Sequence, residues 1–204
     1  MLVEIHADTL IEQYEAGLRD FSATILMGDS LCDLLLNAIN LEQAIVAQVN
    51  MSLTHFRASN FRGANLSQSL LWRTDFSQAN LAVANLSQST LIRATLTQAN
   101  LHQAILTKAD LRVANLQAAH CSDANFAGAD LRYANLQGIN LSGANLRGAD
   151  LTGANMAGAD LSGAILTGTI LRQVDLSQVV LRDVSWSHQH MADFSNHQTL
   201  TTVE

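Results

Sequence analysis

The chain has 204 residues, of which 48% are hydrophobic and 14% charged, with a mean hydropathy of +0.12. This composition excludes an intrinsically disordered chain, which would be poorer in apolar residues and richer in charge. The net charge of −7 and the isoelectric point of about 5.4 disfavour nucleic acid as a partner. No apolar run is long enough to span a membrane, and the first residues lack the basic and apolar parts of a signal peptide, so we expect a cytoplasmic protein without membrane association.

Residues 1–18 form an amino-terminal segment with the pattern of a short helix. Thr9 and Glu12 have the spacing of a capping box, and Gly17 suits the position just after a helix. Leu10, Ile11, Tyr14 and Leu18 provide an apolar face. We therefore predict a helix from about Leu10 to Ala16 that covers the end of the structure that follows.

Residues 19–188 repeat with a period of five. An apolar residue recurs at every fifth position from Phe21 to Trp186, which gives 34 consecutive pentapeptides. A small residue, mostly alanine, stands two places before each central residue, and asparagine or aspartate stands between them. Ten of the eleven glycines fall two places after a central residue, where a turn requires a positive φ.

A period of five fits neither an α-helix nor a long strand. It fits a chain that turns a corner every five residues and points the large and the small residue inward each time. The sequence therefore predicts a solenoid whose corners are built into every repeat.

This pattern resembles the pentapeptide repeat family, and the likeness extends over residues 19–188 without an insertion. The resemblance implies an all-β fold, a right-handed quadrilateral parallel β-helix with four repeats per coil and about 8.5 coils, with a short amino-terminal capping α-helix. The run from Tyr14 to Phe21 is also similar to the first segment of cyanobacterial members.

Residues 189–204 form a polar carboxy-terminal tail, and the repeats before it are degenerate at Val179 and Val184. Two arrangements remain open: the tail folds over Trp186 and Met191, or this end pairs with a second molecule. The chain is thus expected to be a monomer or a dimer through its carboxy-terminal end. His188, His190, Asp193 and His197 are metal-ligand types at short spacing, but no second cluster completes a site, and we predict no bound metal.

Residues 20 apart should stack on one side of the solenoid, which sorts the outward residues into four faces. One face takes the repeats centred on residues 31, 51, 71, 91, 111, 131, 151 and 171. It carries five of the eleven basic residues, one tryptophan and one tyrosine. Because Trp, Tyr and Arg are enriched in binding hot spots, we predict a protein-docking surface here. Its residues are Trp72, Arg73, Ile92, Arg93, Arg112, Arg132, Tyr133 and Arg172.

The alternative for this face is an ordinary solvated surface, in which Asp110, Asp130 and Asp150 partly neutralise the arginines. A second apolar group, Ile25, Leu35 and Ile45, is better explained by packing beneath the cap helix or its linker. Cys121 occupies an interior position and is expected to be a small apolar filler, whereas Cys32 points outward.

A rod of short, insertion-free coils offers no concave pocket, so we predict no enzymatic activity, no catalytic residues, no small-molecule substrate and no cofactor. The repeat segment holds twelve acidic and eleven basic residues and is nearly neutral, unlike the DNA-mimicking, gyrase-interacting members linked to quinolone resistance. The hypothesis is therefore a protein–protein interaction rod, regulatory or scaffolding, whose partner protein is unknown. The alternatives are a gyrase-interacting DNA mimic and a protein similar to the member that regulates heterocyst formation.

Overall fold

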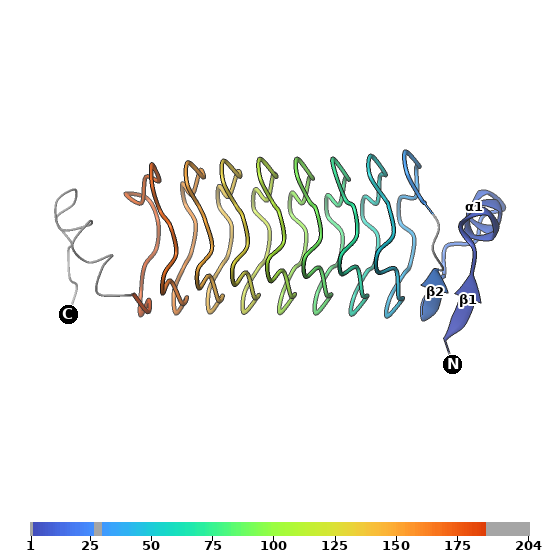
Figure 1. The fold of residues 1–204 in the computed structure, drawn as a ribbon, viewed down its shortest axis with the longest axis horizontal. Helices are drawn as coiled ribbons and strands as arrows, with labels where there is room; N and C mark the ends of the chain where they lie inside the picture. The colour runs from blue at the N-terminus through green and yellow to red at the C-terminus, as the bar shows by residue number, and fades with distance from the viewer. Residues whose placement is uncertain (1, 27–29, 187–204) are drawn as a thin grey trace.

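The computed structural model describes residues 2–26 and 30–186 of the chain. A short strand β1 (Val3–Ile5), a helix α1 (Ala7–Glu15) and a strand β2 (Thr24–Leu26) come first, and a regular stack of coils follows. Figure 1 shows these coils in line along one axis, with α1 at the amino-terminal end of the stack. In the part of the chain that is described, no helix is long and apolar enough to cross a membrane.

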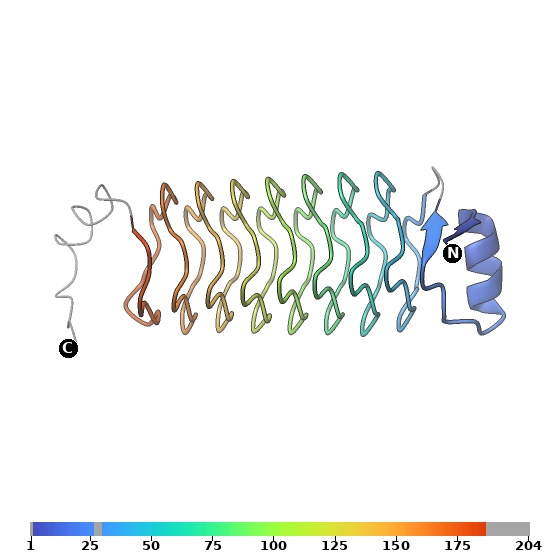
Figure 2. The same cartoon turned by 90° about the horizontal axis from the view of Figure 1, so that it is seen from below.

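Each coil takes 20 residues. Parallel bridges join residues 20 apart, from Asp20 with Asn40 to Ile165 with Ser185. The residue before each centre donates its N–H to the previous coil, as from Asn60 to the Ile39 carbonyl (2.9 Å), and the centre donates to the next, as from Phe61 to the Asn80 carbonyl (2.7 Å). The predicted solenoid is confirmed, and Figure 2 shows its coils stacked in line from a second direction.

The corner residues, two places after each centre, mostly adopt the positive φ that the glycine positions predict. Glycines at the second position after a centre have positive φ, for example +67° at Gly148. Most other residues at this position share it, including Gln48 (φ +61°) and Val113 (φ +59°). The left-handed conformation costs a non-glycine residue roughly 1–2 kcal/mol. The regular turn and coil-to-coil hydrogen bonds therefore hold these corners against their intrinsic preference.

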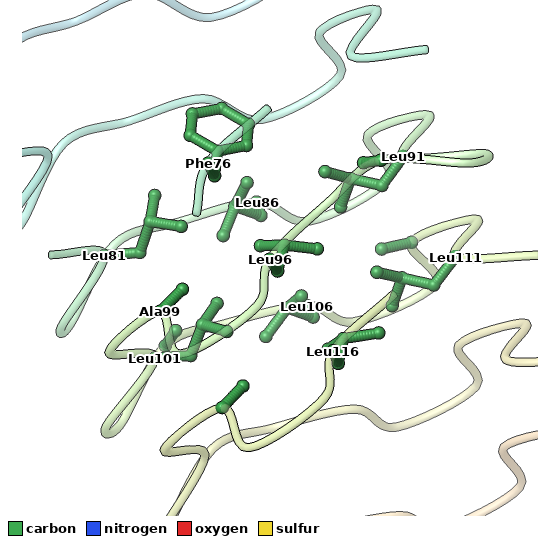
Figure 3. Packing of buried hydrophobic residues seen from close by; sticks show 14 of the residues in the cluster. Phe76, Leu81, Leu86, Leu91, Leu96, Ala99, Leu101, Leu106, Leu111 and Leu116 are labelled. Carbon is green, nitrogen blue, oxygen red and sulfur yellow. The ribbon is translucent and has the colours of Figure 1, made fainter. Parts of the chain in front are cut away.

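The interior is filled by the central residues and the small residues before them, as predicted. Figure 3 shows leucines of successive coils, such as Leu86 and Leu106, stacked along this core. Nearer the amino terminus, Phe56, Phe61 and Phe76 form an aromatic cluster with ring centroids 5.0–5.4 Å apart. Where serine or threonine takes the small position, its hydroxyl donates to a backbone carbonyl, either of the preceding coil, as from Ser69 to Val46 (2.9 Å), or of the same coil, as from Ser89 to Leu86 (2.6 Å).

The amino-terminal cap differs from the prediction in detail. Helix α1 begins three residues before Leu10, with His6 as its N-cap and no side-chain cap, so Thr9 lies inside the helix and the proposed capping box is wrong. Its end is as expected: Gly17 (φ +100°) donates to the Tyr14 carbonyl and Leu18 to the Gln13 carbonyl, a Schellman motif. Leu10 is fully buried against the coils.

Strand β1 was not predicted. It pairs in parallel with β2, with Val3 opposite Thr24 and Ile5 opposite Leu26. It supplies partners for backbone groups that the amino-terminal edge of the stack would otherwise leave free.

The carboxy-terminal coil is less regular. Among the described residues, the ladder has no bridge between Asn155 and Asp175, and Gly158 donates to the Gln178 carbonyl (3.1 Å) one residue beyond the expected acceptor. A surface pocket of about 120 Å³ opens there, lined by Ala154, Asn155, Met156, Ala157, Asp175 and Gln178. Trp186 packs half-buried against the core. The predicted tail 189–204 and the histidines at 188, 190 and 197 lie outside the described residues.

Candidate docking face

The structure brings the predicted docking residues onto neighbouring coils of one face, called here the arginine face. Arg73 donates its backbone N–H to the Ile92 carbonyl, and Arg93 donates to the Arg112 carbonyl, both at 3.0 Å. Arg132 follows one coil further, joined by the N–H of Val113 (3.0 Å). Arg172 lies on the same face but is separated from Arg132 by the coil that contains Gly153.

Arg112 and Arg132 are held by aspartates of their own face. Each directly follows a central residue, and its guanidinium turns back to the carboxylate two places earlier. Arg112 binds Asp110 through two nitrogens (2.8 and 2.7 Å), and Arg132 binds Asp130 in the same way (2.8 and 2.6 Å). This bidentate geometry is the strongest that an exposed ion pair adopts.

The two pairs are linked into a ladder. Nε of Arg112 also lies 3.7 Å from Asp130, and Nε of Arg132 lies 3.9 Å from Asp150 on the next coil. The hydrogen bonds and charge of the aspartates raise the pKa of both arginines. Partial burial would raise the pKa of Asp130, but the hydrogen bonds and charges of Arg132 and Arg112 outweigh it and lower this pKa. In this ladder, each arginine lies between two aspartates, so its charge is balanced within the face.

Arg73 and Arg93 are different. They occupy the corner position itself, with φ of +54° and +57°, and both are exposed. Within residues 2–26 and 30–186, neither guanidinium has an ion pair, and Arg73 instead lies over the ring of Trp72, 5.2 Å from its centroid. The residues that correspond to Asp110 on their coils are Leu70 and Thr90. Two of the four neighbouring arginines are therefore free to bind an external anion.

Exposed apolar side chains gather on the same face. Trp72 is 38% exposed, Leu70 49% and Tyr133 61%. Leu53, Val113 and Ile170 are exposed here too. They are not among the predicted docking residues, since in the sequence these positions look like ordinary variation within the repeat. The 20-residue spacing could have identified Leu53 and Val113. Residues 53, 73, 93 and 113 occupy the same corner of successive coils, so Leu53 and Val113 flank Arg73 and Arg93.

The second apolar group of the sequence analysis is only partly covered. Ile25 pairs with β1 and is half-buried, as is Ile45. Leu35 is 68% exposed, so packing beneath the cap does not account for it. The cap instead reaches this region through the Tyr14 hydroxyl, which donates to the Asn37 carbonyl (2.8 Å).

The remaining candidates have structural roles. Cys121 is fully buried, and this burial raises the pKa of its thiol, whereas Cys32 is partly exposed. Asn40, Asn60, Asn80 and Asn100 form a ladder of side-chain hydrogen bonds from coil to coil (3.0–3.3 Å). Asn140 is not joined to this ladder because His120 occupies the coil between. Across residues 2–26 and 30–186, no group of three ligand-type side chains could hold a metal ion.

Comparison with known proteins establishes the family. The family model for pentapeptide repeats matches residues 36–73, 74–112, 109–148 and 144–183, which is most of the chain. The chain therefore belongs to the pentapeptide repeat family. No curated protein matches it, and none of the matches indicates an enzyme family.

Three solved structures illustrate the likeness. HetL, a pentapeptide repeat protein involved in heterocyst differentiation regulation from the cyanobacterium Nostoc sp. strain PCC 7120, is 29% identical over 89% of this chain and 94% of its own, with a TM-score of 0.47. Rfr23 from the cyanobacterium Cyanothece 51142 is 41% identical over 46% of this chain and 64% of its own, with a TM-score of 0.45. QnrB1, a plasmid-mediated fluoroquinolone resistance protein, is 17% identical over 96% of this chain and 94% of its own, with a TM-score of 0.51, and shares the fold.

Proposed function

We propose that this protein is a non-catalytic interaction rod, cytoplasmic and regulatory or scaffolding in role, that presents its arginine face to another protein. Family membership further implies that the coil is right-handed. The observation that carries the proposal is the gathering of Trp72, Tyr133 and the exposed leucines beside arginines on one rigid face. Large amphipathic side chains on a preformed surface lose little conformational entropy on binding, which suits a docking site.

The DNA-mimicking alternative has less support from the charges. A mimic of duplex DNA needs uncompensated carboxylates along its length. Here Asp110 and Asp130 are bound by arginines, and Asp75 lies 3.7 Å from Arg57. The exposed carboxylates of the described residues are thus partly neutralised along the rod.

Photo-crosslinking from the face tests the proposal. A crosslinking phenylalanine analogue at Val113 or Tyr133 is expected to capture a partner protein in lysate of the source organism. The matched control is Gln103, an exposed corner residue two repeats away on the opposite side. The captured protein is then purified and its affinity for the full chain measured. Equal capture from residue 103 and residue 113, or a purified partner whose affinity ignores Trp72→Ala and Tyr133→Ala, would refute a docking role for this face.

A further inference from the structure

We propose that the amino-terminal half of the arginine face, formed by Leu70, Trp72, Arg73, Ile92 and Arg93, binds a protein segment that places carboxylates beside apolar side chains. This inference rests on the proposed function and specifies the partner's chemistry. These five residues are called the free-arginine patch.

The first step is that the arginines of the face are not equivalent. Arg112 and Arg132 each use two of their five N–H donors on Asp110 and Asp130, and these carboxylates balance their charge, so an incoming carboxylate gains less there. Arg73 and Arg93 have no such partner within the described residues. Anion binding should therefore centre on residues 73 and 93.

The second step is that these two charges repel each other. Their coils are adjacent, joined by the hydrogen bond from Arg73 to the Ile92 carbonyl, and neighbouring strands lie about 4.8 Å apart. On the next coils, aspartates alternate with arginines and remove such repulsion. At residues 73 and 93 the alternating carboxylates are missing, and a bound partner can supply them.

The third step is the apolar surroundings. Trp72 and Leu70 are exposed directly beside Arg73, and the half-buried Ile92 lies beside Arg93. A guanidinium over an indole ring keeps its edge free to donate to a carboxylate. A segment with acidic residues alone would leave this apolar area uncovered, so the partner should carry an aliphatic or aromatic residue next to each acid.

Charge favours a protein over a nucleic acid as the occupant. Tight nucleic-acid binding uses about six to ten phosphate contacts, whereas this patch offers two free guanidiniums. The chain as a whole has a net charge of −7, which disfavours a polyanion as the occupant.

Direct binding to defined probes tests the inference. The probes are fluorescein-labelled peptides in which two glutamates, separated by one to three residues, are flanked by leucine or phenylalanine. Matched peptides carry lysine in place of glutamate, and a single-stranded oligothymidylate represents nucleic acid. Anisotropy of the probe and emission of Trp72 in a Trp186→Phe background report binding to the full chain.

The expected result is that at least one acidic peptide binds, that added salt weakens it, and that Arg73→Gln with Arg93→Gln weakens it about tenfold or more. The matched variant Arg112→Gln with Arg132→Gln should change the affinity less than threefold. Thermal unfolding verifies that both variants remain folded, which is expected because all four side chains are at the surface.

Four outcomes would overturn the inference: no binding of any acidic peptide, equal losses in the two double variants, tighter binding of the oligothymidylate, or a salt-sensitive dimer that the residue 73 and 93 changes abolish. The last would place a second copy of the chain on the patch. The proposed function is judged separately. If the crosslinked partner binds and is insensitive to changes at residues 73 and 93, the docking face stands and the free-arginine patch does not.

Discussion

The ring of Tyr133 lies so close over Gly153, one coil away, that a Cβ on residue 153 would come within 2.7 Å of two ring carbons. Gly153 also has a φ of +67°. A glycine at this corner therefore avoids the cost of a positive φ and leaves room for a side chain of the docking face.

Gly153→Ala is expected to destabilise the protein more than Gly148→Ala. Both residues have the same φ, but nothing lies within 4 Å of a Cβ at residue 148. The control should lose about 1 kcal/mol of unfolding free energy, since left-handed strain is partly offset by a more restricted unfolded chain. In a Tyr133→Ala background the two alanine substitutions should cost the same. Urea unfolding measures all four differences, and equal costs with Tyr133 present would contradict the contact.

Releasing the locked arginines should strengthen acidic-peptide binding. Asp110→Asn with Asp130→Asn removes the carboxylates that hold Arg112 and Arg132, so that these two guanidiniums can bind an anion alongside Arg73 and Arg93. We expect the affinity for the acidic probe to rise several-fold at low salt. Asp75→Asn, which frees Arg57 on another face, is the control and should have little effect. Unchanged affinity in the double variant would show that the ladder does not limit anion binding.

Asp160 should contribute to the acid sensitivity of the fold. The Ser162 hydroxyl (2.6 Å) and backbone N–H (2.9 Å) donate to its carboxylate and lower its pKa. A carboxyl with a lower pKa in the folded state contributes stability above its ordinary pKa of about 3.9, and this contribution is lost as the pH falls through the folded value. Asp160→Asn should lose less stability on acidification than the wild type.

At neutral pH the same Asp160→Asn variant should be nearly as stable as the wild type. Asparagine accepts the same pair of bonds at Asn140, from the Ser142 hydroxyl and backbone N–H (2.7 and 2.9 Å). Asp160→Ala, which removes the acceptor, should lose about 1 kcal/mol. Unfolding curves between neutral pH and the acid range test both, and identical acid profiles for Asp160→Asn and wild type would contradict the argument.

A cavity in a middle coil should make the two ends of the rod unfold separately. Leu106→Ala removes a fully buried side chain and should cost about 2–5 kcal/mol. Because each coil contacts only its neighbours, the damage should separate unfolding into two steps. Leu176→Ala, in the irregular last coil, is the comparison and should leave one main transition. Hydrogen exchange by mass spectrometry locates the opened coils, and a single cooperative transition in Leu106→Ala would contradict this prediction.

The coil could be predicted because the five-residue period is unbroken. Every fifth residue from Phe21 to Trp186 is apolar, so one repeat rule gives the position of each residue in this segment. It missed β1 because Val3–Ile5 is too short to show a pattern and lies one residue out of the 20-residue register, with Glu4 opposite Ile25. It misplaced the start of α1 because Thr9 and Glu12 have the right spacing for a cap, while the helix begins at Ala7, which is buried.

The candidate face was located from stacking arithmetic, but its chemistry was not. The 20-residue stacking places Arg93 and Arg112 on the same side of the rod and does not distinguish them. Their difference depends on which residue stands at the corner and on whether an aspartate lies two places earlier, as Asp110 does for Arg112. Side-chain direction at the corner had to be seen before the free and the paired arginines could be told apart.

The missing bridge between Asn155 and Asp175 sets a direction for how the rod comes apart. The coils are joined one to the next, so opening proceeds from whichever end has the fewest bonds to break. At the amino-terminal end, β1 and the buried Leu10 must be released first, whereas the last coil has already lost part of its ladder. Under heat or mechanical tension, the coil that holds the missing bridge should therefore open before the described coils nearer to β1. A partner bound at Trp72 and Arg93 would contact coils that unfold late. It would therefore remain bound while the last described coils open.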